Sequence, residues 1–356
     1  MDSKTLLEQH GERIRDLRGE GYGRMRIAGL LSEELGVEIR PHWVEQVFKW
    51  LKIYREPVPI SEPNPPTEDA FDIEGWIAGR VKASQKKRLK FSRSVRTLTL
   101  PAQPIGIAVL GDPHVDNDGC DWALLYEHVQ LLRETDGAVA ACVGDMQDNW
   151  VGRLATLYSN SSTTASDGWH ASRWLLDQLQ WIALVGGNHD AWAHGPGVDP
   201  LGWLTRECGG QCYDTDELRI TLEWAGRPDL EPIVWILRHD FGGRSWYHPT
   251  HGPHKEAMLD GRAHLLTAGH IHQWGELTTE QRHGRVTRAL RVRGYKRSDE
   301  YAKAKGFFEQ RHGAACFVVI DPCADEPSRL RVFWDLKVGC EYLGWLRKMR
   351  KKPEMG

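Results

Sequence analysis

The sequence predicts an α/β protein in which two β-sheets pack face to face with helices outside, preceded by a small all-α unit. Between residues 105 and 190, apolar runs of strand length alternate with helical stripes, which is typical of βαβ units. After residue 210, the apolar runs follow one another with few helices between them, which favours adjacent strands. The first 55 residues show only helical periodicity.

Residues 4–52 are predicted to form three short helices. A glycine-rich turn follows the first helix, Gly36 ends the second, and Pro41 suits the first turn of the third. This arrangement resembles a helix-turn-helix. In that interpretation, the third helix exposes four side chains to a DNA groove: His42, Glu45, Gln46 and Lys49. Three basic residues are then expected near phosphates: Arg40, Lys52 and Arg55. The alternative is a three-helix module that binds a protein partner.

Residues 56–69 are rich in proline and acidic residues, which predicts a stiff, extended linker. The stretch 80–96 that follows is basic and contains no acidic residue; it is either a solvated face or a contact to phosphates through Lys86, Lys87 and Arg88. The predicted organisation is a helix-turn-helix-like module over 1–55, a linker over 56–100, an α/β domain over 101–340 and a basic C-terminal tail over 341–356.

Charge and cysteine content narrow the class of protein. The net charge of −3 does not by itself indicate a nucleic-acid binder. The seven cysteines are scattered and odd in number, which argues against a disulfide framework and favours a reducing cytosol. No apolar run is long enough to span a membrane. We therefore expect a cytoplasmic protein without a membrane partner, whereas the sequence does not predict its oligomeric state.

Five short polar segments each follow an apolar run of strand length. They read GDPHVD (111–116), GDMQDNW (144–150), GGNHD (186–190), LRHD (237–240) and GHIH (269–272). The ends of strands are where α/β sheets bind ligands. Asp, His and Asn are ligands of divalent metals. The sequence therefore predicts a metal site built from five loops.

The spacing within these segments suits two cations. Asp112 and His114 are two residues apart, so an extended chain directs both to the same side, and the same holds for His270 and His272. Asp145 has two carboxylate oxygens and can bridge two ions about 3.5–4 Å apart. An amide oxygen and a further imidazole are available from Asn188 and His239.

Two cations held in this way suit hydrolysis at phosphorus by in-line attack of a metal-bound hydroxide. His189 is then available as a general acid or as a group that stabilises the phosphoryl oxygens, and Asp190 is expected to orient it. Other groups beside the motifs are candidates for substrate binding: Arg238 and Arg244 for phosphate, and Trp150 and Trp274 for stacking on bases.

The five motifs resemble those of the calcineurin-like metallophosphoesterases, over roughly residues 105–336. The resemblance implies a four-layer α/β/β/α sandwich with two mixed sheets, and His189 as the catalytic histidine. One metal is then held by Asp112, His114, Asp145 and His272. The other is held by Asp145, Asn188, His239 and His270.

Two features distinguish this sequence within the resemblance. The fourth motif usually reads HG, whereas here Asp240 follows the histidine, so His251 is an alternative to His239 as ligand. Asp148 stands where the protein-phosphatase branch carries arginine, which favours phosphodiesterases, nucleases and nucleotide hydrolases. The whole chain is similar to phage and prophage metallophosphoesterases, with a core like that of DNA-repair nucleases, which places it in a bacterial or phage-infected cell.

The function predicted from the sequence is a dinuclear phosphodiesterase that cleaves DNA. The expected cofactor is a pair of Mn²⁺ ions, with Fe, Zn²⁺ and Mg²⁺ as alternatives. The alternative function is a phosphatase or nucleotide hydrolase that acts on small phosphoesters, with the N-terminal module binding a protein.

Overall fold

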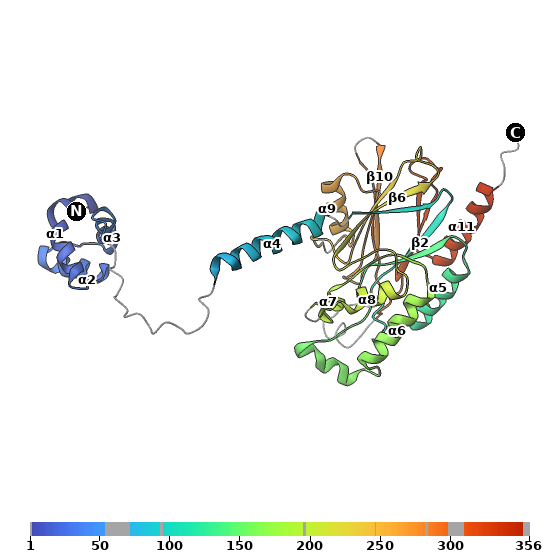
Figure 1. Ribbon diagram of the computed structural model, residues 1–356, viewed down its shortest axis with the longest axis horizontal. Coiled ribbons are helices and arrows are strands. Elements are labelled where there is room, and N and C mark those ends of the chain that lie inside the picture. The colour runs from blue at the N-terminus through green and yellow to red at the C-terminus, as the bar shows by residue number, and fades with distance from the viewer. Residues whose placement is uncertain are drawn as a thin grey trace. The chain divides into compact units, whose positions relative to one another are not determined.

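The computed structural model describes residues 2–53, 72–92, 95–194, 197–245, 247–281, 284–297 and 310–351. The chain divides into two compact units, residues 1–80 and 81–356 (Figure 1). Arg55, the linker predicted over 56–69, the side chain of Arg88, Trp246 and residues 352–356 lie outside the described part.

The N-terminal unit contains the three predicted helices, α1 (Ser3–Gly19), α2 (Arg24–Leu35) and α3 (Pro41–Trp50). The Asp2 side chain caps α1 by accepting hydrogen bonds from the first turn. Gly36 ends α2 in the left-handed conformation that glycine adopts without strain. One side chain or more from each helix is fully buried at the centre of the bundle: Leu6, Ile14, Ile27, Leu31, Val44 and Val47.

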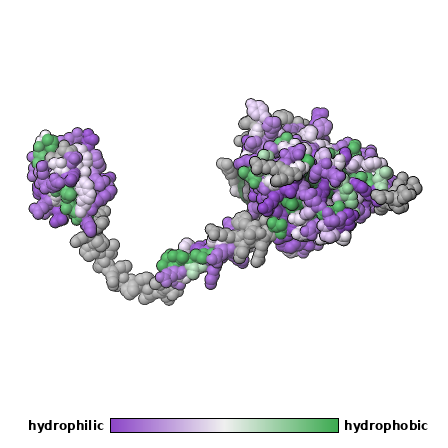
Figure 2. All heavy atoms as spheres, turned by 90° about the horizontal axis from the view of Figure 1, so that it is seen from above, coloured by the Kyte–Doolittle hydropathy of each residue, from purple (hydrophilic) through white to green (hydrophobic). Residues whose placement is uncertain are grey.

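The stretch predicted as the basic linker contains two regular elements instead. Helix α4 (Ile73–Ser92) is continuous, and Figure 2 shows hydrophobic residues on its surface. Its aliphatic side chains Ile73, Ile77 and Val81 are each about half exposed. Strand β1 (Val95–Pro101) pairs in parallel with β6. The predicted boundary at residue 100 is therefore wrong, because Leu98 and Leu100 pack against the core between the sheets.

One sheet, sheet B, has the strand order β12-β11-β2-β3-β4-β5. Strands β2 to β5 are parallel, β11 runs antiparallel to β2, and β12 runs antiparallel to β11. The bounds are β2 (Ile105–Leu110), β3 (Ala138–Cys142), β4 (Trp181–Val185), β5 (Tyr213–Asp214), β11 (Ala315–Ile320) and β12 (Leu330–Phe333).

The other sheet, sheet A, has the order β1-β6-β7-β8-β10-β9 and mixes parallel with antiparallel pairs. Its remaining strands are β6 (Glu217–Ala225), β7 (Ile233–Arg238), β8 (Leu265–Ala268), β9 (Gly275–Glu280) and β10 (Val286–Arg291). Strands β1 and β9 form its edges, and their half-exposed, alternating side chains fit that position.

The side chains of β2 show how the layers are built. Ile107 and Val109 face sheet A and join the core between the sheets, whereas Ala108 and Leu110 face the helices on the other side. Those helices are α5 (Trp122–Glu134), α6 (Ala165–Gln178), α8 (Pro200–Glu207) and α11 (Leu336–Lys351). Helix α9 (His251–Asp260) covers the outer face of sheet A. This confirms the four-layer α/β/β/α sandwich.

The sequence predicted a basic tail over residues 341–356, but residues 341–351 belong to helix α11. Leu343 is fully buried and Leu346 is nearly so, because both pack with α5 on the outer face of sheet B. Lys348 is exposed, whereas Arg347 donates a hydrogen bond of 2.7 Å to the Pro104 carbonyl and Arg350 pairs with Asp321. Within the described residues, we find no helix that is long and apolar enough to cross a membrane.

Candidate metal centre

The five polar segments meet because the strands that precede them end at the same edge of the two sheets. Asp112 follows β2, Asp145 follows β3 and Asn188 follows β4 in sheet B. His239 directly follows β7 and His270 follows β8 in sheet A. The motif loops of both sheets therefore lie close together at one edge of the sandwich, which is where α/β sheets bind ligands.

The backbone of these loops is strained at the predicted ligands. Seven non-glycine residues have positive φ among those described, and all except Lys52 lie in the motif loops: Asp112, His114, Asp145, Asn149, His270 and His272. Residues other than glycine rarely adopt a positive φ, and each residue held in this conformation costs about 1–3 kcal/mol of folding free energy. Such strain gathers at functional sites, where the surrounding fold enforces it.

One cluster of ligand atoms is formed by Asp145, His239, His270 and Asn188. The Nε2 atom of His239 lies 3.2 Å from Asp145 Oδ2, 3.0 Å from His270 Nδ1 and 3.0 Å from Asn188 Oδ1. Asp145, His239 and His270 together could hold a metal ion. These are the four residues that the resemblance implies for the second metal.

The neighbouring carboxylate, Asp112, is fully buried. Its Oδ2 accepts a hydrogen bond of 2.7 Å from the His270 amide, whereas its Oδ1 has no hydrogen-bond partner and lies 3.6 Å from His239 Nδ1. Burial, which His239 opposes, raises the pKa of Asp112 to about 7. A buried oxygen without a donor is an atom that a cation would satisfy.

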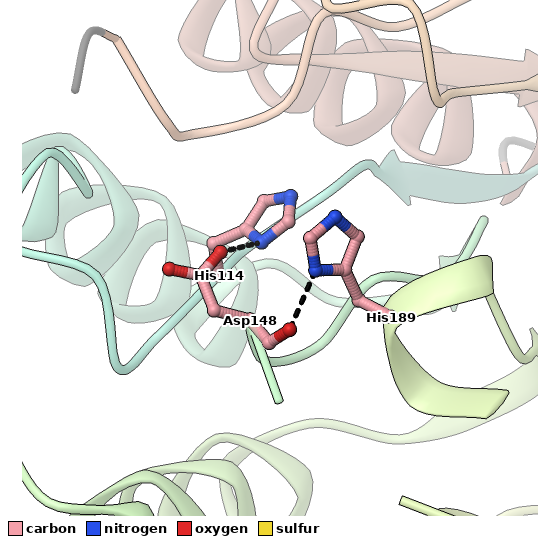
Figure 3. A group of neighbouring side chains, drawn as sticks. All are labelled: His114, Asp148 and His189. Atoms are coloured by element: carbon pink, nitrogen blue, oxygen red, sulfur yellow. Dashed lines mark hydrogen bonds and ion pairs between the residues drawn. The ribbon is translucent and has the colours of Figure 1, made fainter. Parts of the chain in front are cut away.

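The second cluster contains His114, Asp148 and His189, and these three could also hold a metal ion (Figure 3). His114 Nδ1 lies 2.7 Å from Asp148 Oδ1, and His114 Nε2 lies 3.8 Å from Asp145 Oδ2. The His272 ring stacks on His114 with a centroid distance of 5.4 Å. Asp148 therefore orients the His114 ring while leaving Nε2 directed at Asp145, which is how a carboxylate supports a metal-binding histidine.

The His189 ring is held by the second motif. Its Nδ1 lies 2.6 Å from the carbonyl oxygen of Asp148, so Nδ1 carries the proton and donates it. The His189 amide donates to Asp145 Oδ1 at 2.9 Å. Burial lowers the pKa of His189 to about 4. The ring packs edge-on against Trp150 at 5.0 Å and against Trp192 at 4.2 Å.

Asp190 does not orient His189, contrary to the prediction. Its two oxygens accept hydrogen bonds from the backbone amides of Asp145, Met146 and Gly187 at 2.8 to 3.1 Å. Burial, with the charge of Asp145, raises the pKa of Asp190 to about 7. Asp190 lies in the first turn of helix α7 (Asn188–Trp192), and its carboxylate faces the end of β3. The Asp190 carboxylate thus fixes the loop that carries Asp145.

His239, rather than His251, lies at the cluster. His251 is exposed at the start of α9, and it belongs to neither of the candidate metal groups found among the described residues. Asp240, which replaces the usual glycine, accepts a hydrogen bond of 2.8 Å from Arg291 Nη2. Arg291 is almost fully buried and also donates to the carbonyl oxygens of Pro249 and Gly269. One guanidinium therefore ties both ends of the loop between β7 and α9 to the loop that follows β8.

We predict that Arg291→Met lowers the free energy of unfolding by about 3–5 kcal/mol, because it leaves buried carbonyls and Asp240 without their donor. Urea denaturation would measure this change. The matched control is Arg227→Met, which breaks an exposed ion pair between Arg227 and Asp229 and should cost less than about 1 kcal/mol. Equal losses in the two variants would contradict the tying role of Arg291.

Only some of the four predicted substrate-binding residues lie beside the candidate metal ligands. Arg244 Nη2 lies 3.3 Å from His270 Nε2, so this side chain reaches the cluster. Arg238 instead forms an ion pair with Glu217 and lies over the Phe241 ring. Trp150 contacts His189, whereas Trp274 packs on Trp334 at 4.8 Å.

Lys296 is a residue of the site that the sequence did not indicate. Its Nζ lies 3.1 Å from Asp148 Oδ1 and 5.1 Å from the centre of the Trp150 ring. Lysine outside any motif carries no sequence signal, and it arrives here only because the chain after β10 passes the site. Its charge, together with that of His114, keeps the pKa of Asp148 well below its usual value despite burial.

The donor set fits a pair of divalent cations. Asp112 and Asp145 are both buried and close to three imidazoles, which is the mixed oxygen and nitrogen chemistry of Mn²⁺, Fe and Zn²⁺ sites. Burial alone would lower the pKa of His239, yet the carboxylates of Asp145 and Asp112 raise it to about 10. The centre therefore attracts positive charge strongly, which is what a bound cation would supply.

The fold and the site together define a two-sheet α/β sandwich with a centre suited to two metals. In its motifs, its sheets and this centre, the chain resembles the calcineurin-like metallophosphoesterases. No protein-family model matches the chain, and no curated protein matches it.

Solved structures with a related arrangement are distant. The chain is similar to a predicted phosphoesterase from Streptococcus pneumoniae (13% identity, 65% of this chain and 98% of that chain, TM-score 0.30). It is also similar to Zn²⁺-bound Vps29 from Entamoeba histolytica (13%, 64% and 97%, TM-score 0.35). A third is a putative 5′-nucleotidase from Staphylococcus aureus (14%, 65% and 53%, TM-score 0.35).

Proposed function

We propose that this protein is a dinuclear metal-dependent phosphoesterase that hydrolyses phosphodiester bonds in DNA. The observation that carries the proposal is the position of Asp145, whose carboxylate lies between the cluster of His239, His270 and Asn188 and the cluster of His114 and His272. A bridging carboxylate with ligands on both sides is the arrangement that a pair of cations requires.

In this proposal Asp112, His114, Asp145 and His272 hold one cation, and Asp145, Asn188, His239 and His270 hold the other. The two ions, once bound, supply a hydroxide at neutral pH and neutralise charge on the phosphoryl oxygens. His189 is held through Nδ1, so Nε2 is the ring nitrogen left for proton transfer. Because burial favours the neutral ring, Nε2 would first take up a proton from the attacking water and then pass it to the leaving oxygen. Arg244 binds a phosphoryl oxygen beside His270.

The DNA substrate is supported by the charge and exposure of groups outside the centre. His42, Gln46 and Lys49 are exposed on α3 at spacings of four and three residues, so they share one helix face, and Arg40 is exposed just before it. Lys86 and Lys87 are exposed on α4. These groups would contact bases and phosphates, while Trp150 and Lys296 would accept a base and a phosphate beside the site.

The experiment that tests this function is a substrate panel with Mn²⁺ and with chelator. The panel contains single-stranded, double-stranded and nicked DNA, RNA, a bis-aryl phosphodiester, an aryl phosphomonoester and nucleotides. We expect metal-dependent cleavage of DNA and of the diester. Cleavage of monoesters and nucleotides alone would replace the DNA proposal by the small-substrate alternative, and inactivity on the whole panel would reject the phosphoesterase itself.

We predict that Arg40→Ala combined with Lys49→Ala weakens DNA binding and lowers the slope of log affinity against log salt by about 2, because two phosphate contacts are lost. Fluorescence anisotropy over a salt series measures both quantities. Arg13→Ala is the matched control, since Arg13 is exposed and lies beside a glutamate like Arg40 and Lys49, but belongs to α1 instead of α3. An unchanged slope in the double variant would show that α3 does not contact DNA and would favour a protein partner for this unit.

A further inference from the structure

Helix α11 carries two apolar stripes, of which the fold fully uses only one. The stripe that joins the core on the outer face of sheet B consists of Leu336, Cys340, Leu343 and Leu346. The other stripe, which we call the outer seam, consists of Val338, Tyr342, Trp345 and Met349. Three of these side chains are about half exposed, by 48% (Val338), 54% (Trp345) and 48% (Met349). One stripe is enough to hold a helix on its own domain, so the outer seam is left for a second contact.

The outer seam is ordered by contacts with the neighbouring strand. The Tyr342 ring packs against Phe333 at 5.1 Å and against Trp345 at 5.5 Å between ring centres, and the Arg331 guanidinium lies over the Tyr342 ring. Phe333 and Arg331 belong to β12, the outermost strand of sheet B. Figure 1 shows α11 at the margin of the C-terminal unit. The seam is therefore a preformed surface that another molecule can reach.

The spacing within the outer seam is self-complementary. Its residues follow one another at intervals of four, three and four, which is the spacing of contact positions in paired helices. This order is the same in both directions along the helix. Two copies of α11 that run antiparallel about a two-fold axis therefore place Tyr342 opposite the second copy's Trp345, and Val338 opposite the second copy's Met349. Each position of the seam then meets an apolar side chain.

The charges beside the outer seam favour the same arrangement. Glu341 and Lys348 are both exposed, and because they are two helical turns apart they lie on the same flank of the seam. Neither forms an ion pair within the described part of the chain. In the antiparallel pair, Glu341 of each copy lies beside Lys348 of the other, which gives two pairs of opposite charge. A parallel pair would instead bring Glu341 toward Leu346 of the second copy, which carries no charge.

We propose that the outer seam of α11 is an interface between two copies of this protein, which pair antiparallel about a two-fold axis. An occupant of the seam has to match its apolar spacing and the order of its charges, and α11 of a second copy supplies both. Few side chains contribute from each copy, so the interface is smaller than that of a permanent dimer. We expect a reversible dimer with a dissociation constant on the order of 10 µM. The interface uses no residue of the metal centre, so it does not depend on the proposed reaction.

The test is sedimentation equilibrium of the full chain at concentrations between about 1 and 200 µM, which span the expected dissociation constant. We expect a monomer that converts to a dimer, and we expect Trp345→Ala to weaken the dimer at least about tenfold, since a central tryptophan dominates such an interface. Trp203→Ala is the matched control, because Trp203 is 57% exposed on α8 and lies outside the seam. A monomer at every concentration would overturn the proposal, as would a dimer that Trp345→Ala leaves unchanged. A monomer that co-sediments with vesicles of an anionic phospholipid would assign the seam to a lipid surface instead.

Charge reversal tests the antiparallel arrangement separately. Glu341→Lys and Lys348→Glu each place like charges opposite one another at both contacts, so each variant alone should form its dimer about tenfold more weakly. Mixing the two folded variants should restore the affinity, because every lysine of one copy then lies beside a glutamate of the other. Dimers that neither reversal weakens, or variants that fail to pair on mixing, would reject the arrangement. If circular dichroism shows that Trp345→Ala is unfolded, these two variants and their mixture decide the question.

Discussion

Asp145→Asn should reduce metal-dependent phosphoester hydrolysis by about 10³-fold or more. The carboxylate of Asp145 lies within 3.2 Å of His239 and 3.8 Å of His114, so the change removes negative charge from both proposed metal positions at once. Several kcal/mol of transition-state stabilisation depend on the metals, and each 1.36 kcal/mol corresponds to a factor of ten. Steady-state kinetics with the bis-aryl phosphodiester, together with metal analysis of the purified protein, measures the effect.

The matched control for this change is Asp177→Asn. Asp177 is an exposed aspartate on α6 and forms an ion pair with Arg173. We expect this control to retain full activity and metal content. Full activity of Asp145→Asn with two metals bound would show that Asp145 does not bridge them, and the dinuclear assignment would fail.

His189→Gln should lower kcat by about 10²–10⁴-fold while the protein keeps its metals. The His189 ring is anchored to the Asp148 carbonyl and is not one of the residues proposed to hold an ion. If His189 protonates the leaving oxygen, the loss should be larger for an alkyl leaving group than for a nitrophenyl one, because the poorer leaving group needs the proton more. A structural defect would slow both substrates by the same factor.

His194→Gln controls for this variant, because His194 follows the same short helix and contacts Asp199 at 3.2 Å instead of the cluster. It should leave kcat unchanged. A loss of bound metal in His189→Gln would instead identify His189 as a ligand, which its place in the group with His114 and Asp148 would then explain.

The sheets and the motif loops could be predicted from the sequence because the central strands are buried on both faces. Strands such as β2 and β4 consist of buried residues throughout, which produces an uninterrupted apolar signal followed by the polar motif. Strand β1 was missed because an edge strand needs few apolar residues. Helix α9 was missed because its buried side consists mainly of small residues, Gly252, Pro253 and Ala257, which give no helical stripe.

The contacts within the site could be predicted less well, because they depend on direction and on distant partners. Asp190 is adjacent to His189 in sequence, yet the turn of α7 directs its carboxylate to the Asp145 loop. The replacement of glycine by Asp240 gave no hint of Arg291, which lies 51 residues further along the chain. Lys296 reaches Asp148 from 148 residues away. Sequence spacing describes only neighbours, so these pairings required the fold.

The left-handed backbone at the motif loops also bears on how this protein can be engineered. Asparagine at Asp112, or glycine at His114 or His272, would relieve the strain of the left-handed backbone, while removing the side chain that the chemistry needs. A selection for heat resistance alone would therefore favour inactive variants at these positions. Stabilising changes should be sought instead in the outer helices, where conformation and catalysis do not compete.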